Sequence, residues 1–483
     1  MAALDDWVAE EARFAASAMA RAVSATHLVK ERPGFGQRVI PRPGSVLASP
    51  VLAAYDPDPD YFFHWFRDSA IVIDALRVAL TEGLDEGRAI DRLREFVEFS
   101  RSLRGLDGRA FLSHGRFREK IEPSFLESVR PDAEIGAVSG AAVLGETRVN
   151  PDGTLDFTRW ARPQTDGPAL RILALLRWRD VGRDLDEVLQ AAMQDLVIGD
   201  LDFTLSHANN PSFDIWEEES GYHYYTQLVQ AEALARGAEW LTDMGDTARA
   251  SACRSLADEI APRLEAYWDA AAGYYRSRTG VAGGASEKAL DIAVVLAVLH
   301  AGRAKGPHSL LDPRAQATLT ALEELFEAEY AINRRRPSDH GPAMGRYAGD
   351  AYYSGGAYYF ATLAAAEFYF KLAVALPSGA DLAAAEENAR FRRRLSAAKG
   401  AAENGAPAAA AIERGDAIMQ TVQAFTPASG DLSEQFDRTT GAQTSSKHLA
   451  WSYAAFITAA ASRREAYRAM RGSGLPVTPA GAA

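Results

Sequence analysis

The 483-residue sequence contains a single cysteine, Cys253, which excludes an intrachain disulfide bond and any metal site built from cysteines. No segment approaches the ~20 consecutive apolar residues that a membrane-spanning helix requires. No basic run occurs, and 52 Lys and Arg against 65 Asp and Glu give a formal net charge of −13. This balance argues against nucleic acid and anionic membranes as partners. No repeat of fixed period is visible, which argues against an open solenoid.

Helical patterns dominate what is present. Apolar residues recur at spacings of three and four, for example at Val72, Ile73 and Leu76 after Asp68. We therefore expect an all-α protein with about a dozen helices or slightly more, and a short hairpin near 273–278. Helix pairs wound into a closed ring are one such arrangement, which the spacing alone does not prove. Further helical segments are expected near 3–24, 89–103, 184–199, 223–243, 247–267, 286–302, 313–330, 355–376, 380–398, 408–424 and 446–465.

The domain organisation follows from composition. No Ser, Thr and Pro-rich linker divides the chain, so we expect one large helical domain over residues 1–470. The Gly- and Ala-rich stretch 396–411 is typical of a surface connection, and residues 471–483 of a disordered tail.

Aromatic residues (8 Trp, 17 Tyr and 21 Phe) cluster with charged residues between the predicted helices. Sugars need this combination, because their C–H faces stack on flat rings while their hydroxyls bind carboxylates and guanidinium groups. A single cluster is also compatible with a capped helix start beside a core aromatic; five clusters favour a sugar site. They are YFFHWFRDS (61–69), RWARPQTDGP (159–168), PSFDIWEEESGYHYY (211–225), MGRYAGDAYYSGGAYYF (344–360) and LSEQFDRTTG (432–441).

The acidic run Glu217-Glu218-Glu219, preceded by Asp214 and Trp216, is the sharpest of these features. Adjacent carboxylates repel one another, which raises the pKa of the least solvated and suits a general acid. The alternative is that the run stabilises the start of a helix near Tyr222 through the helix dipole.

A second candidate carboxylate is Glu434, more than 200 residues downstream. If two carboxylates flank a glycosidic bond, a separation of ~6.5–9.5 Å predicts inversion and ~5–5.5 Å predicts retention.

Two arginine–aspartate pairs complete the candidate site. Arg67 and Asp68 stand at the start of a predicted helix. Either Asp68 or Ser69 caps this helix, or Arg67 and Asp68 present a forked cation and a carboxylate to sugar hydroxyls. Arg346 and Asp350 allow the same two interpretations.

Through these residues the sequence resembles glycoside hydrolase family 15, the glucoamylases. Six blocks carry the resemblance in family order, over roughly residues 3 to 465. They are ALDDWVAEEARFA (3–15), DPDYFFHWFRDSA (58–70), RWARPQTDGPALR (159–171), FDIWEE (213–218), GRYAGDAYYSG (345–355) with TLAAAE (362–367), and LSEQFDRTTGAQTSSKHLAWSYAAF (432–456).

The resemblance implies an (α/α)6 barrel that hydrolyses α-1,4-glucans from their non-reducing ends and releases β-D-glucose by inversion. Glu217 resembles the general acid and Glu434 the general base, and neither a cofactor nor a metal is required. Trp160 resembles an aromatic lid, Asp214 a support for the acid, and Arg162 and Asp166 residues that position the lid loop. The remaining substrate-binding residues implied are Tyr61, Arg67, Asp68, Trp216, Glu218, Arg346, Asp350 and Trp451.

The sequence also departs from the family pattern. Gly349 replaces an acidic residue, Tyr358 a tryptophan, and His64 a small residue, for which we expect a packing role. Because these departures concern the sites beyond the first glucose, exo-hydrolysis of α-1,6-glucans and hydrolysis of trehalose are alternative activities. A non-catalytic glucan-binding protein is an alternative of a different class, and a helical scaffold for protein partners is a third.

No starch-binding module follows the predicted barrel, so soluble dextrins and maltooligosaccharides are the expected substrates rather than granular starch. We expect a monomer. Because residue 3 onward resembles a mature amino terminus, a periplasmic or secreted location is expected rather than a cytoplasmic one, with Met1 in place of a removed signal peptide.

Overall fold

The computed structural model describes residues 2–53, 57–85, 87–114, 116–181, 185–284, 286–376, 382–397 and 407–472. They form two compact units, which we name the 18–260 unit and the 261–483 unit; the latter also includes residues 1–17. The chain passes from one unit to the other within helices α1 (Ala2–Ala20) and α9 (Thr247–Glu265). Among the described residues, no helix has both the length and the apolar character needed to cross a bilayer.

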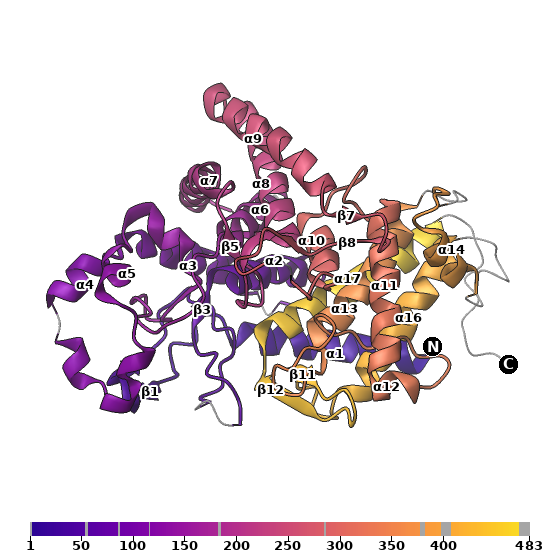
Figure 1. Ribbon diagram of the computed structural model, residues 1–483, viewed down its shortest axis with the longest axis horizontal. Coiled ribbons are helices and arrows are strands. Elements are labelled where there is room, and N and C mark those ends of the chain that lie inside the picture. The colour runs from indigo at the N-terminus through magenta and orange to yellow at the C-terminus, as the bar shows by residue number, and fades with distance from the viewer. Residues whose placement is uncertain are drawn as a thin grey trace. The chain divides into compact units, whose positions relative to one another are not determined.

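The 18–260 unit is built of helices joined by loops that carry short antiparallel strand pairs (Figure 1). Its helices are α2 (Phe66–Thr81), α3 (Ala89–Ser102), α4 (Gly108–His114), α5 (Asp132–Gly136), α6 (Asp166–Asp180), α7 (Glu187–His207) and α8 (Tyr224–Asp243), together with most of α9. Its strand pairs are β1 (Lys30–Arg32) with β2 (Gln37–Val39), β3 (His64–Trp65) with β4 (Arg148–Val149), and β5 (Ser212–Phe213) with β6 (Ser220–His223). In the described part of this unit, 3-10 helices cover Pro33–Phe35, Leu103–Gly105, Phe117–Lys120, Pro123–Ser128 and Gly140–Gly145.

Helix α6 forms the centre of the core of this unit, packing against α2, α7 and α8. Every residue from Asp166 to Leu175 is buried, as expected for a helix covered on all sides. The approach to α2 is close because α6 carries a glycine at the contact: a Cβ on Gly167 would lie 2.6 Å from the Cβ of Phe66. This proximity brings the first turns of α2 and α6 together, and both turns carry candidate site residues.

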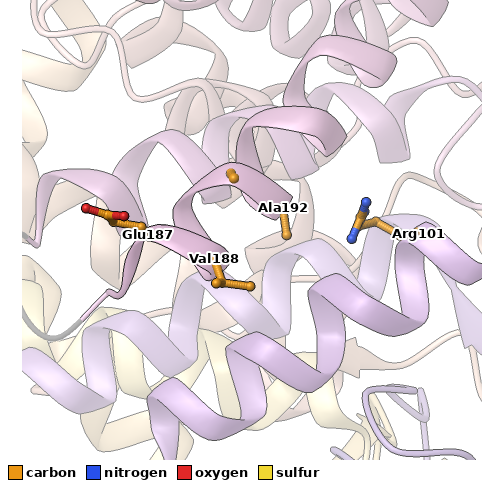
Figure 2. Close-up of a pocket in the computed structure, with 5 residues that line it drawn as sticks. Arg101, Glu187, Val188 and Ala192 are labelled. Carbon is orange, nitrogen blue, oxygen red and sulfur yellow. The ribbon is translucent and has the colours of Figure 1, made fainter.

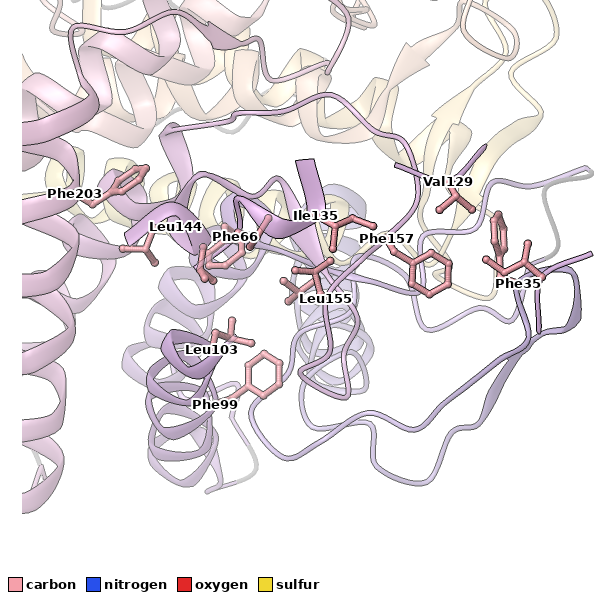
Figure 3. Close-up of a cluster of buried hydrophobic side chains, with 14 residues drawn as sticks. Phe35, Phe66, Phe99, Leu103, Val129, Ile135, Leu144, Leu155, Phe157 and Phe203 are labelled. Carbon is pink, nitrogen blue, oxygen red and sulfur yellow. The ribbon is translucent and has the colours of Figure 1, made fainter. Parts of the chain in front are cut away.

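A second core of aliphatic and aromatic side chains lies under the loops between α3 and α6 (Figure 3). Buried residues such as Phe35, Phe99, Leu103 and Phe157 pack together there, with Phe111, Phe117 and Phe125 at the margin. Burying such side chains contributes roughly 1.5–3 kcal/mol each, which holds these loops in place without long helices.

The 261–483 unit also consists of helices joined by loops that carry short strands (Figure 1). Its helices are α10 (Ala293–Ala301), α11 (Pro313–Glu329), α12 (Ala331–Arg334), α13 (Tyr359–Ala375), α14 (Ala389–Ser396), α16 (Pro407–Phe425) and α17 (Ala450–Gly472), together with most of α1. Its strands are β7 (Trp268–Asp269), β8 (Tyr274–Tyr275), β9 (Arg278–Thr279), β10 (Ala357–Tyr358), β11 (Ser433–Phe436) and β12 (Gln443–Lys447).

Helix α13 is the core of the 261–483 unit and packs against α16 and α17. Its sequence is mostly apolar, and nearly every residue from Tyr359 to Ala373 is buried. Strand β10 leads directly into α13 and pairs with β11, which pairs with β12. The register of β11 and β12 shifts between Ser433 and Gln435, which places Glu434 at an irregularity in the sheet.

Most helices expected from the sequence are present, and most of their ends differ by a few residues. The helices expected at 184–199 and 446–465 extend further, to His207 in α7 and Gly472 in α17. The hairpin near 273–278 is also confirmed, because β8 pairs with β7. The helix expected at 286–302 begins only at Ala293, since the preceding segment carries Asp291, whose buried carboxylate pairs with Arg278. The helix expected at 380–398 begins at Ala389. Helices α4 and α5 were not expected, because both are short and lack a clear apolar period.

Two expectations fall largely outside the described residues. Of the tail 471–483, residues 471 and 472 belong to α17 and residues 473–483 are not described. Of the surface connection 396–411, residues 398–406 are not described.

Candidate active site

The acidic run lies in the tight connection between β5 and β6, not at the start of a helix. Helix α8 begins at Tyr224, so the alternative interpretation of the run as a dipole-stabilised first turn is wrong. The connection is closed by Asp214: its Oδ1 accepts the backbone N–H groups of Glu218 and Glu219 at 2.8 and 2.9 Å. These bonds cross the turn and leave Glu217 at its tip.

Glu217 has φ +64°, in the left-handed region that an L-residue with a long side chain seldom adopts. Such a conformation costs of order 1–3 kcal/mol and persists only where neighbouring contacts enforce it. The contacts here are the carbonyl of Asp214, which accepts the Glu217 N–H at 2.9 Å, and the Asp214 carboxylate described above.

Three donors hold the side-chain carboxylate of Glu217, whose side chain is only 11% exposed. The indole Nε1 of Trp65 donates to Oε1 at 2.7 Å, and Arg67 Nη2 donates to the same oxygen at 3.1 Å. The indole of Trp160 donates to Oε2. Because both oxygens are bound, the plane of the carboxyl group is fixed.

Arg67 is the cation shared by a buried group of three carboxylates, which we name the Arg67 cluster. Besides Glu217, it pairs with Asp68 at 3.2 Å and with Asp166 at 3.6 Å. One guanidinium cannot neutralise three carboxylates, so the cluster favours retention of a proton. Burial raises the pKa of Asp68, and burial together with the charges of Glu217 and Asp68 raises the pKa of Asp166 to about 6 despite Arg67.

The sequence left open whether Asp68 or Ser69 caps α2. The N-cap is Trp65, and it makes no side-chain capping bond. Ser69 Oγ donates to the Phe66 carbonyl instead, so neither residue caps the helix. The helix start instead directs Arg67 and Asp68 at Glu217 and Asp166.

The candidate aromatic residues surround Trp65. Tyr61 contacts its ring edge-on at 5.4 Å, and Trp160 lies 6.3 Å away at an interplanar angle of 77°. Trp160 is 39% exposed, which leaves indole surface open to a ligand. Trp216 is half-buried and Glu218 exposed in the turn that carries Glu217.

In the 261–483 unit, the candidate base Glu434 is buried in β11 and accepts a hydrogen bond from Ser445 Oγ of β12. Ser445 has φ +61°, so the hydroxyl donor stands on a constrained backbone. A buried carboxylate with a hydroxyl donor is chemically suited to accept a proton from water.

Arg346 and Asp350 form a buried, two-pronged ion pair, with 2.7 Å between Nε and Oδ2. They lie in the loop before β10, where no helix begins, so the capping interpretation is wrong here as well. Trp451, in the first turn of α17, stacks on Phe360 at 4.3 Å and is buried.

The positions that depart from the family pattern also have physical explanations. His64 is fully buried against Phe66, Phe96 and Phe99, and its Nδ1 accepts the Val46 N–H at 2.9 Å, which confirms a packing role. Burial lowers the pKa of His64 to about 3, so it stays neutral.

The other two departures lie in and beside the loop before β10. Tyr358 is buried, and its hydroxyl accepts a hydrogen bond from Gln435 Nε2 at 2.7 Å. Gly349 has φ +73° and nothing within 4 Å of a would-be Cβ, so its backbone requires glycine although space is available.

Sequence reasoning missed two donors. Trp65 belongs to a recognised cluster, but no spacing rule connects its indole N–H to a carboxylate 152 residues away. Ser445 belongs to the last family block and has no distinguishing neighbour in the sequence. Strand pairing would have supplied the signal, since β12 lies directly beside β11.

A hollow of about 400 Å³ lies elsewhere on the 18–260 unit, between α3 and α7 (Figure 2). It is lined by Arg101, Glu187, Val188, Ala191 and Ala192. None of the candidate catalytic or sugar-binding residues lines it, so it does not compete with the Arg67 cluster as a site.

Comparisons with known proteins identify the family of this chain. Residues 133–461 match the family Glycosyl hydrolases family 15. Glucoamylase 1 of Rhizopus oryzae is 28% identical over 459 residues, which cover 89% of this chain and 70% of that protein. Glucoamylase-1 of Schizophyllum commune is 30% identical over 452 residues, covering 90% and 72%.

The fold agrees with a solved relative. The family 15 glucoamylase from Hypocrea jecorina superimposes with a TM-score of 0.77 at 26% identity, over 99% of this chain and 76% of that chain. The all-α, (α/α)6 fold class expected from the sequence is thereby confirmed. The family match covers more than half of the chain, and the chain therefore belongs to glycosyl hydrolase family 15.

Proposed function

We propose that Glu217 is the general acid and Glu434 the general base of this enzyme, an exo-acting glucoamylase that releases β-D-glucose from the non-reducing ends of α-1,4-glucans. Soluble dextrins and maltooligosaccharides are the proposed substrates. The observation that carries the proposal is the fixed orientation of the Glu217 carboxyl group, which two indoles and a guanidinium hold at the tip of the β5–β6 turn.

The proposed reaction is a single displacement. Glu217 gives its proton to the glycosidic oxygen while Glu434 takes a proton from the attacking water, so the anomeric centre inverts. The hydrogen bond from Ser445 suits a carboxylate that is ionised before the reaction. That both carboxyl groups act on one glycosidic bond rests on the family assignment.

The proposed sugar ligands are the remaining candidates. Arg67 and Asp68, with Arg346 and Asp350, would bind the hydroxyls of the terminal glucose, and Trp160 would cover the substrate at the cleaved bond. We assign Asp214 to the support of the turn, because its carboxylate binds two backbone N–H groups there.

The catalytic assignment is tested with Glu217→Gln and Glu434→Gln on maltoheptaose. Each should lose roughly 10²–10⁴-fold in kcat, since each removes one proton transfer. Glu219→Gln is the matched control, a neighbouring carboxylate in the same acidic run to which we assign no role, and should retain wild-type kcat. Equal activity of wild type and Glu217→Gln would contradict the assignment.

Stereochemistry and substrate are tested separately. Proton NMR of the first product should show β-glucose, and α-glucose as the initial product would exclude the single displacement. Assays on maltose, isomaltose, trehalose and dextran distinguish the α-1,4 activity from the two alternatives, and trehalose as the best substrate would overturn the proposed specificity.

We further propose a single catalytic domain over residues 1–470, a monomer in solution and a periplasmic or secreted location. A chain ending at residue 472 should keep full activity. Light scattering gives the mass in solution, and activity measurements on fractionated cells decide the location; activity confined to the cytoplasmic fraction would refute it.

A further inference from the structure

Arg148 belongs to β4 and is almost completely buried, yet none of the proposed catalytic steps uses it. Its guanidinium carbon lies 3.6 Å from the ring centre of Trp160 and 4.0 Å from that of Phe63. On Phe63 lies a second guanidinium, that of Arg32, at 3.9 Å. Arg32, Phe63, Arg148 and Trp160 thus form a stack of alternating cations and rings, which we name the stacked column.

Each cation of the stacked column has its own buried carboxylate. Arg32 Nε donates to Asp60 at 2.7 Å, and Arg148 Nε donates to Asp156 at 2.9 Å. Asp156 also pairs with Arg162 at 3.0 Å, and Arg130 and Arg162 both pair with Glu146. Four guanidinium groups thus share three buried carboxylates, and the guanidinium planes cannot rotate without breaking buried ion pairs.

Trp160 ends the stacked column and differs from its other members in being 39% exposed. Two groups fix this indole: Arg148 against its face and Glu217, which accepts its N–H. Loss of the cation would remove the contact on one face of this indole, which would then gain rotational freedom.

We propose that Arg148 is a positioning residue that fixes the indole of Trp160, both as a stacking surface for the sugar and as a donor to Glu217. The inference rests on the proposed function, in which Trp160 covers the substrate. The buried guanidinium of Arg148, itself held by Asp156, thereby fixes the position of this stacking surface.

The chemistry of arginine explains why this residue type is needed. Its flat guanidinium stacks on an aromatic face while its edge donates to a carboxylate, whereas a lysine ammonium cannot do both. Arg148→Met removes the cation and keeps an unbranched chain. Arg148→Lys keeps the charge beside Asp156 but loses the flat surface, and it serves if Arg148→Met does not fold.

A double-mutant cycle tests whether Arg148 acts through Trp160. Arg148→Met should lower kcat/KM on maltooligosaccharides about 10-fold in the wild-type background, the scale of one desolvated cation–π contact. In a Trp160→Ala background the same substitution should change kcat/KM less than about 2-fold. An equal loss in both backgrounds would overturn the proposal. The matched control is Arg118→Met, which removes a half-exposed arginine that lies on Phe117 at 4.9 Å, and it should change neither value.

A spectroscopic measurement separates this proposal from the proposed function. Trp65 and Trp160 lie 6.3 Å apart at 77°, a geometry in which their indole transitions couple and give a signal in far-ultraviolet circular dichroism. Trp160→Ala defines that signal. Arg148→Met, or Arg148→Lys in its place, should reduce it, and an unchanged signal would overturn the positioning role. An inactive wild-type protein would refute the proposed function instead and leave this measurement valid.

Discussion

Asp166→Asn should make the stability of the folded protein less sensitive to rising pH. Burial and the neighbouring negative charges raise the pKa of Asp166 from 3.8 to about 6. The folded state therefore binds this proton more tightly than the unfolded chain does. The resulting stabilisation is complete below pH 3.8 and is lost as the pH rises through 6. The shift corresponds to about 3 kcal/mol, since one pKa unit is about 1.4 kcal/mol.

The variant lacks this titration, so its Tm relative to wild type should rise between pH 4 and pH 8. For a chain of 483 residues the unfolding entropy is roughly 1 kcal/mol per kelvin, so about 3 kcal/mol corresponds to about 3 °C. Scanning calorimetry of both proteins at one scan rate measures the difference. Asp258→Asn, at an exposed position of α9, should show no such trend.

A constant Tm difference between Asp166→Asn and wild type at both pH values would refute the reasoning. The same variant offers a second readout in activity. With one carboxyl group fewer on Arg67, the cluster retains its proton less tightly. The basic limb of the pH profile of kcat should therefore move to lower pH, and a limb at unchanged pH would show that Asp166 does not influence the acid.

Three further substitutions test the geometry. Gly167→Ala should lower Tm and kcat/KM together, because its Cβ would meet the α2 backbone at 3.0 Å, whereas Gly105→Ala, with nothing within 4 Å, should change neither. Ser445→Ala removes the donor to Glu434, which then takes up a proton more readily, so the acidic limb of the pH–rate profile should move to higher pH. Asp214→Ala should lower kcat far more than Asp214→Asn, whose amide oxygen still accepts the turn N–H groups.

The helices were the most predictable part of the fold, because their apolar spacing is local. The limits of α8 and α9 follow from the sequence within two residues. The start of α10 does not, since the segment before it is held by the Asp291–Arg278 ion pair, which involves side chains 13 residues apart. Local periodicity carries no signal for such a pair.

In the candidate site too, features within one short segment were predictable and contacts between distant segments were not. Glu217, Arg67 and Asp68 were identifiable because charged residues stand beside aromatic residues in short segments. Their arrangement could not be predicted from the sequence, because the sharing of Arg67 among three carboxylates depends on how closely α2 approaches α6. The helix-cap interpretation of the acidic run failed for a related reason: a four-residue strand, β6, separates the run from α8.

The left-handed backbone of Glu217 has a consequence for engineering. Glycine and asparagine adopt φ near +64° with less strain than glutamate, and neither adds a carboxylate to the group around Arg67. A library screened only for heat resistance or soluble yield should therefore enrich these residues at position 217 and return well-folded proteins that have lost their turnover. Efforts to raise the stability of this protein therefore need to keep glutamate at position 217, or to select for glucose release in every round.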